Sequence, residues 1–189
     1  APINWAILNG EAETGVSIMY MAKELDAGDV ILQKSTPIGA EEDAQSLTAR
    51  LADLGAEALS EAVKALSEGT AGRTPQDGSL QTYASMLSRE MSPVDWTRSA
   101  HEIACQVRGL IPWPCASTDI IGGGPVKLFS VRETGEDTAV PPGTVVSAGK
   151  QGIGIACGDG KVLLVLELQA QGGKRMAAAA YLLGHPIQC

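Results

Sequence analysis

The sequence predicts two regions of different type, an α/β region followed by a β-rich region of short antiparallel strands. Two stretches rich in β-branched and apolar residues come first, and a long segment with helical spacing of apolar residues follows them. Short apolar stretches separated by glycine turns occupy much of the second half. We therefore expect residues 1–69 to be the C-terminal part of an α/β domain, residues 70–93 a linker, and residues 94–189 a small barrel domain.

The α/β region begins with two predicted strands and ends with a predicted helix. The strands cover residues 14–20 and 29–38, and Pro37 is typical of a strand end. Asp43 can cap the helix, and Gly69 stands where a C-terminal cap belongs. The apolar positions at helical spacing are Leu47, Leu51, Leu54, Ala58, Ala62 and Leu66. This order of elements is typical of the later part of an α/β domain.

The segment after Gly69 is rich in glycine and proline and shows little periodicity, so we interpret it as a linker on the surface. Beyond it, Ser99 and Glu102 have the spacing of a capping box, which predicts a helix that ends near Gly109. The following Pro112-Trp113-Pro114 forbids helix. We expect Trp113 to anchor the core at the start of the second domain, rather than to stack on a nucleic-acid base.

Glycine turns divide the rest of the chain into predicted strands. Gly122-Gly123-Gly124-Pro125 separates two apolar stretches, residues 143–146 open another, and Gly158-Asp159-Gly160 joins residues 153–155 to the run 162–168. Short strands with such turns predict a small antiparallel barrel. The alanine-rich segment 176–183 predicts a final helix.

Composition excludes several functional classes. No apolar run in the sequence approaches the roughly 18 to 20 residues of a membrane span, so we expect no membrane association. The first residues do not resemble a signal peptide, and the first residue is not Met, which suggests a fragment. A net charge of −8 disfavours general nucleic-acid binding. The four cysteines lack C-x-x-C spacing, which predicts reduced thiols in the cytosol and no metal site.

The best candidate for chemistry is the acidic loop Leu25-Asp26-Ala27-Gly28-Asp29, between the two predicted strands. A loop on a rigid scaffold can direct a carboxylate into a cleft, where it can accept or donate a proton. The same composition is also common in solvated turns. The loop by itself therefore leaves both interpretations open.

Three segments in succession resemble the folate-dependent formyltransferases. They are Ala1-Pro2-Ile3, Ala12-Glu13-Thr14-Gly15-Val16-Ser17-Ile18-Met19 and Leu25-Asp26-Ala27-Gly28-Asp29. Further motifs resemble the additional C-terminal domain of methionyl-tRNA formyltransferases. These are Val94-Asp95-Trp96, the helix ending in Arg108, Pro112-Trp113-Pro114, Pro125-Val126-Lys127, Pro142-Gly143-Thr144 and Gly158-Asp159-Gly160. The resemblance covers essentially the whole chain.

The resemblance implies the C-terminal part of a Rossmann-like formyltransferase domain, a linker and a small OB-like barrel that binds tRNA. It implies transfer of a formyl group from 10-formyltetrahydrofolate to the amino group of methionyl initiator tRNA, without a metal. The family's catalytic set is an Asn, a His and an Asp, and Asp26 occupies the Asp position. Asp26 would orient and polarise the His.

Residues for the two substrates also follow from the resemblance. The donor-binding segment would be Met21, Ala22, Lys23, Glu24, Leu25 and Asp26. The tRNA-binding residues would be Arg89, Arg108, Lys127, Lys174 and Arg175, each of which could equally be part of a solvated surface. The implied protein is a cytoplasmic monomer of translation initiation.

The family's catalytic Asn and His lie before the position of Ala1, so we expect this stretch alone not to catalyse formyl transfer. Two alternatives remain open. One is another folate-dependent transferase or hydrolase, such as an amino-sugar formyltransferase. The other is a non-catalytic RNA-binding module, which the acidic net charge disfavours.

Overall fold

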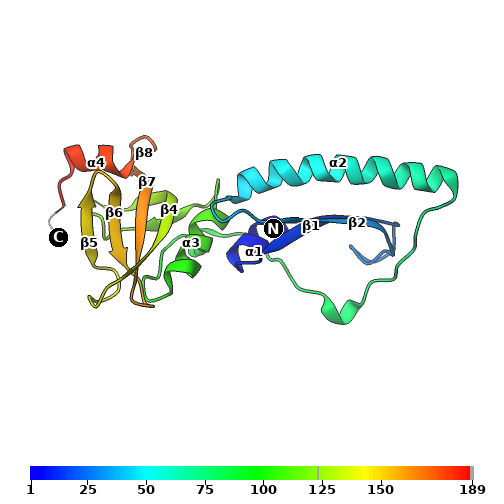
Figure 1. The fold of residues 1–189 in the computed structure, drawn as a ribbon, viewed down its shortest axis with the longest axis horizontal. Coiled ribbons are helices and arrows are strands. Elements are labelled where there is room, and N and C mark those ends of the chain that lie inside the picture. Colours follow the sequence, from blue (N-terminus) through cyan, green and yellow to red (C-terminus); the bar gives the residue numbers. More distant parts are fainter. Residues whose placement is uncertain (123, 188–189) are drawn as a thin grey trace.

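The computed structural model describes residues 1–122 and 124–187 of the chain. The molecule is elongated, with an N-terminal part around a long helix and a β-rich C-terminal part (Figure 1). Gly123 of the predicted glycine turn and Cys189 lie outside the described residues. Cys105, Cys115 and Cys157 are buried and free, as expected for reduced thiols.

The N-terminal part contains a short helix, a two-stranded sheet and the long helix. Helix α1 covers Pro2–Leu8, strand β1 Glu13–Met19, strand β2 Val30–Pro37 and helix α2 Ala44–Glu68. The strands pair antiparallel, and both the strands and the long helix lie where the sequence predicts them. Among the described residues, no helix has the length and hydropathy to cross a membrane.

Local signals define both ends of α2. The Asp43 carboxylate accepts a hydrogen bond from the Ser46 backbone N–H at 2.8 Å. In return, the Ser46 hydroxyl oxygen accepts a hydrogen bond from the Asp43 backbone N–H. Gly69 ends the helix in the left-handed conformation, with φ +72°. Both caps are thus confirmed.

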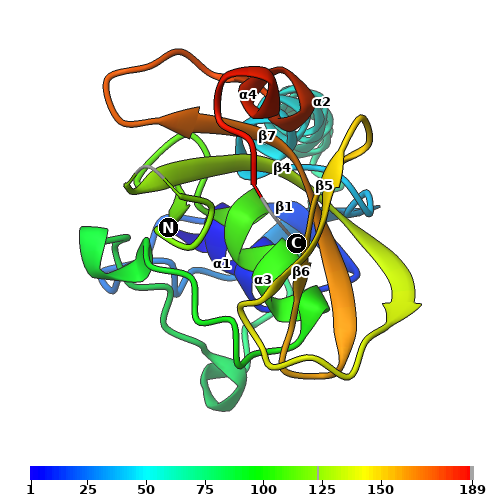
Figure 2. The same ribbon diagram turned by 90° about the vertical axis from the view of Figure 1, so that its left-hand side faces the viewer.

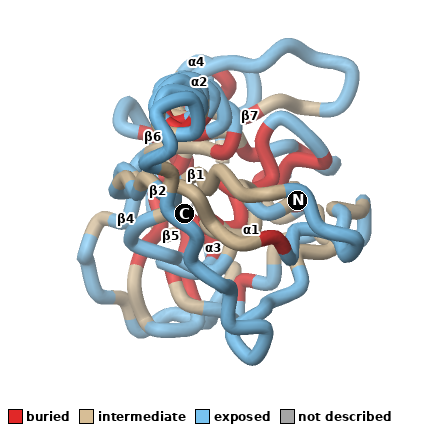
Figure 3. The backbone as a smooth tube through the Cα atoms, turned by 90° about the vertical axis from the view of Figure 1, so that its right-hand side faces the viewer, coloured by how far each residue is buried: buried red, intermediate tan, exposed pale blue. Residues whose placement is uncertain are grey.

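The core beneath α2 is small. It consists of Ile7, Ala44, Leu47 and Leu51, with partly buried neighbours such as Val16 and Leu54. Further along the helix, Ala58 and Ala62 are buried, whereas Leu59, Val63 and Leu66 are exposed. Figure 3 shows most of α2 as exposed, whereas buried residues concentrate in the β-rich part.

The segment between the two parts contains two short 3-10 helices, η1 at Gly78–Leu80 and η2 at Arg89–Met91. It is otherwise irregular and mostly exposed, as expected for a surface linker. Helix α3 follows at Ala100–Gly109 and begins with the predicted capping box of Ser99 and Glu102. The helix bounds and its cap are therefore confirmed.

The C-terminal part is a six-stranded antiparallel sheet with α3 and a terminal helix packed on it. The strands are β3 Ala116–Thr118, β4 Val126–Asp137, β5 Val145–Gly149, β6 Gly152–Ala156, β7 Lys161–Ala170 and β8 Met176–Ala177, and the terminal helix is α4 Ala178–Gly184. The strand order is β3-β4-β7-β6-β5, and β8 pairs with β7. The sheet curves around α3 in Figure 2, and both elements contribute to the main hydrophobic core.

Within the described residues the sheet is open, so the predicted closed barrel is not confirmed. To close the barrel, another strand would have to pair with the outer edge of β3. The end of the linker pairs with this edge instead. Ser117 donates its N–H to Ser92 at 2.7 Å and accepts from the Val94 N–H at 2.9 Å. The linker therefore takes the hydrogen bonds that a closing strand would need.

Two further details correct the sequence predictions. Trp113 is 50% exposed, and the buried tryptophan is Trp96, whose indole N–H donates to the Thr118 hydroxyl at 3.0 Å. Around Trp113, the buried positions are taken by Ile111 and Cys115. The helix expected over 176–183 begins only at Ala178, because the two residues before it pair with β7 as β8.

The Glu102 carboxylate makes the stability of α3 sensitive to acid. Hydrogen bonds from the Ser99 backbone N–H and hydroxyl, and then from Arg98, lower the pKa of Glu102 from 4.5 to about 2. A lowered carboxyl pKa stabilises the folded state above pH 4.5, and this contribution is lost as the pH falls towards 2.

We therefore expect Glu102→Gln to lower the free energy of unfolding at neutral pH and to lose this effect in acid. Urea unfolding at neutral pH and at about pH 3 measures this difference in stability. The contribution of Glu102 is lost between its two pKa values, 4.5 and about 2, and pH 3 lies in that range. Glu136→Gln, at an exposed position of β4, is the control. A difference between wild type and Glu102→Gln that does not shrink in acid would contradict this account.

Candidate functional site

The acidic loop joins β1 to β2 and has a tightly defined backbone. The Tyr20 N–H donates to the Asp29 carbonyl at 3.0 Å and closes the loop. Asp26 has φ +54°, in the left-handed region that aspartate tolerates better than most residues. A Cβ atom at Gly28 would lie 1.7 Å from the Tyr20 carbonyl oxygen, so no side chain fits there. The loop conformation thus requires Gly28.

The linker holds this loop from outside. Thr74 and Val30 exchange two backbone hydrogen bonds, of 2.8 and 2.9 Å, so the linker pairs with the start of β2. Two residues on, the Gln76 side-chain amide donates to the carbonyl of Asp26 at 2.9 Å and to that of Gly28 at 2.6 Å. The linker is therefore in direct contact with the loop.

A second linker residue contacts the two ends of the loop. The Arg73 guanidinium lies 3.4 Å from an Asp29 carboxylate oxygen and 4.2 Å from the centre of the Tyr20 ring. The ion pair is largely solvated, so its contribution to stability is small. Its geometric effect is to bring linker, strand end and loop end together.

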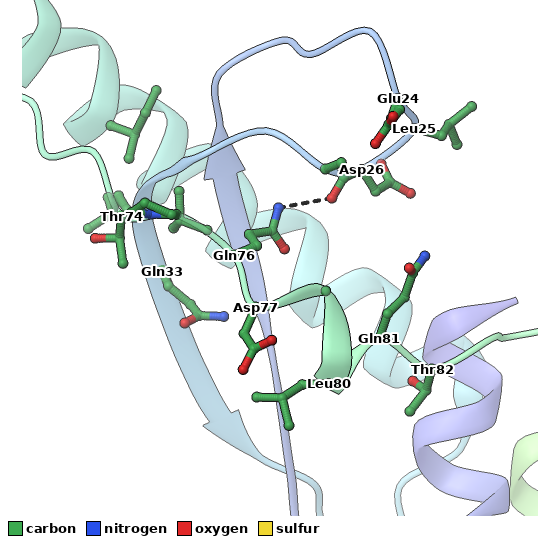
Figure 4. Close-up of a pocket in the computed structure, with 16 residues that line it drawn as sticks. Glu24, Leu25, Asp26, Gln33, Thr74, Gln76, Asp77, Leu80, Gln81 and Thr82 are labelled. Carbon is green, nitrogen blue, oxygen red and sulfur yellow. Dashed lines mark hydrogen bonds between the residues drawn. The ribbon is translucent and has the colours of Figure 1, made fainter.

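A cavity of about 1040 Å³ lies between the loop, β2 and the linker (Figure 4). Its lining combines carboxylates, amides and aliphatic side chains with the backbone of two irregular segments. The lining residues are Glu24, Leu25, Asp26, Ala27, Val30, Ile31, Leu32, Gln33, Thr74, Pro75, Gln76, Asp77, Gly78, Leu80, Gln81 and Thr82. Backbone and amide groups together supply both donors and acceptors, as a polar heterocyclic ligand requires.

Only the second half of the predicted donor-binding segment lines this cavity. Glu24, Leu25 and Asp26 line it, whereas Met21, Ala22 and Lys23 do not, and Met21 is 99% exposed. The linker amides Gln76 and Gln81 line it although the sequence analysis did not single them out. No local pattern indicates them, since Gln76 bonds to a residue 50 positions away.

Three of the predicted basic residues lie on β4 and in the segment between β7 and β8. Lys127 of β4 lines a second cavity, of about 390 Å³, together with Gly172 of the turn after β7. Lys174 is exposed in the same turn, and Arg175 pairs with Glu167. Burial raises the pKa of the Cys115 thiol, and the positive charges of Lys127 and Arg175 oppose this shift.

Arg108 and Arg89 lie elsewhere. The Arg108 guanidinium donates to the Glu42 carbonyl at 3.0 Å and contacts the Cys105 sulfur at 3.4 Å. It thereby connects α3 to the segment between β2 and α2, and phosphate contact would compete with these bonds. Arg89 is exposed in η2. The five predicted basic residues thus do not form one cluster.

Two family models match this chain in succession. The model described as "Formyl transferase" matches residues 1–63, and the model described as "Formyl transferase, C-terminal domain" matches residues 86–186. Two relatives are named methionyl-tRNA formyltransferase. The one from Trichlorobacter lovleyi is 46% identical over 99% of this chain, and the one from Citrifermentans bemidjiense is 45% identical over 100%. The chain spans 58% of the length of each.

Solved structures share the fold. HypX from Aquifex aeolicus in complex with tetrahydrofolic acid superposes with a TM-score of 0.69 at 23% identity, over 95% of this chain and 32% of that protein. The N-formyltransferase from Helicobacter canadensis, in complex with folinic acid and dTDP-3-aminofucose, superposes with a TM-score of 0.71 at 18% identity. The superposition covers 86% of this chain and 59% of that protein. With both family models matched in order, the chain belongs to the formyl transferase family.

Proposed function

We propose that the protein transfers a formyl group from 10-formyltetrahydrofolate to the amino group of methionyl initiator tRNA in the cytoplasm. The observation that carries this proposal is the identity of 41–46% to relatives of that name, along nearly the whole chain. The cavity beside Asp26 supports it, because its donors and acceptors suit a folate heterocycle.

The reaction replaces one carbon–nitrogen bond by another. The neutral methionyl amine attacks the formyl carbon, the bond between that carbon and the folate nitrogen breaks, and a proton passes from the amine to the departing nitrogen. In this proposal Asp26 orients the groups that move the proton. Glu24, Leu25 and Asp26 contact the donor, together with the linker amide of Gln81 across the cavity.

Each part of the chain has a role in this proposal. Residues 1–69 carry the formyl-transfer site, residues 70–93 connect the parts, and residues 94–189 form an OB-like domain that contacts tRNA. The basic residues that serve tRNA are Lys127 on β4, Lys174 and Arg175 between β7 and β8, Arg89 in the linker and Arg108 on α3. The active protein is a monomer.

Asp26→Ala in the full-length protein should reduce formylation of methionyl initiator tRNA by about 10²- to 10⁴-fold, the usual range for loss of acid–base catalysis. The rate is measured with saturating donor, and tRNA affinity should stay unchanged. Asp53→Ala, at an exposed position of α2, is the matched control.

Unchanged activity of Asp26→Ala would remove Asp26 from the mechanism. An inactive wild type that still binds tRNA would favour the RNA-binding module. The same assay with a dTDP-linked amino sugar as acceptor tests the other alternative. Formylation of the sugar but not of the tRNA would replace the proposed substrate.

Replacing Lys127 and Lys174 together by Ala should weaken initiator tRNA binding and make it less dependent on salt. Each phosphate contact that is lost should reduce the slope of log Kd against log salt by about 1. Binding is measured over a series of salt concentrations, with the exposed Lys150→Ala as control. A slope equal to that of the control would show that these lysines do not contact the tRNA backbone.

A further inference from the structure

We infer that Gln76 is a positioning residue, which fixes the backbone of the acidic loop and thereby the direction of the Asp26 carboxylate. This inference rests on the proposed function of Asp26, and it gives the linker a role in catalysis beyond connecting the two parts. Figure 4 shows the Gln76 side chain directed at the Asp26 carbonyl across the cavity.

The number of hydrogen-bond donors on Gln76 matches the number of carbonyl acceptors, which supports the inference. A glutamine amide nitrogen carries two N–H donors, and Gln76 Nε2 has two carbonyl acceptors within reach, Asp26 O at 2.9 Å and Gly28 O at 2.6 Å. In the reverse orientation of the amide, its oxygen would face both carbonyl oxygens. Only the donor orientation is therefore favourable.

The two bonds act on the part of the loop that carries Asp26. The Asp26 carbonyl belongs to the peptide group between residues 26 and 27, and the Gly28 carbonyl to that between residues 28 and 29. Orienting both peptide groups stabilises the left-handed backbone of Asp26, which has φ +54°. Since that conformation is uncommon for a residue with a side chain, the two bonds from Gln76 help to keep it populated.

Gln76 is itself held on both sides. Before it, Thr74 exchanges two backbone hydrogen bonds with Val30 of β2. After it, the Asp77 carboxylate accepts from the Ser79 N–H at 2.9 Å and from the Ser79 hydroxyl at 2.7 Å, which caps η1. A donor that is fixed in this way can position the loop without a large loss of its own freedom.

The direct test compares two substitutions in the full-length protein. Gln76→Glu has almost the same shape but directs a carboxylate at two carbonyl oxygens, whereas Gln76→Ala only removes the donors. We expect kcat to fall about three- to tenfold for Gln76→Ala, and further for Gln76→Glu, with KM for tRNA unchanged. A purely space-filling role predicts the opposite order. Gln151→Ala, in the exposed turn after β5, is the control.

Amide hydrogen exchange of the same variants provides a readout that does not depend on activity. Exchange over residues 20–29 should become faster in both Gln76 variants, chiefly at the Tyr20 amide, whose hydrogen bond to the Asp29 carbonyl closes the loop, while exchange in α2 and α3 stays unchanged. Unchanged exchange over 20–29, or faster exchange with a wild-type kcat, would overturn the inference. A general loss of protection would also overturn it and assign Gln76 a structural role. If the wild type does not formylate tRNA, the proposed function fails, and the exchange data still show whether Gln76 holds the loop.

Discussion

Two hydrogen bonds from one amide, and one position without room for a side chain, determine the shape of the candidate site. Gln76 binds the carbonyls of Asp26 and Gly28, and Gly28 packs against the Tyr20 carbonyl so closely that only glycine fits. Together they bring a loop and a linker, distant in sequence, to two sides of one cavity. Every chemical role given to Asp26 depends on this arrangement.

The arrangement also depends on how the two parts of the molecule are joined. Helix α1 packs on α3 so closely that a Cβ at Gly109 would lie 2.7 Å from the Leu8 side chain. The Asn4 amide donates to the Gly109 carbonyl at 2.8 Å, and the Trp5 indole donates to Ser85 of the linker at 2.9 Å. The linker is thus held at both ends, by β2 at its start and by α1 near its end. The C-terminal part is therefore packed directly against α1 of the N-terminal part.

The sequence predicted the elements whose signals are local. Asp43, Gly69 and the Ser99–Glu102 pair mark helix ends through contacts within a few residues, and the structure places those ends accordingly. It did not predict features that depend on distant partners. The linker occupies the β3 edge that a closed barrel would need, and Trp96 rather than Trp113 lies in the core, because these outcomes depend on tertiary packing. For the same reason the resemblance indicated Asp26, whereas the contact of Gln76 was visible only in three dimensions.

We propose that the loop and the linker together bind the formyl donor. Hydrogen exchange of the full-length protein with and without tetrahydrofolate tests it most directly, because both segments are irregular and largely exposed in the free chain. The account predicts slower exchange in residues 24–26 and 74–82 together when the folate is bound. Protection confined to other parts of the protein, with both segments unchanged, would contradict it.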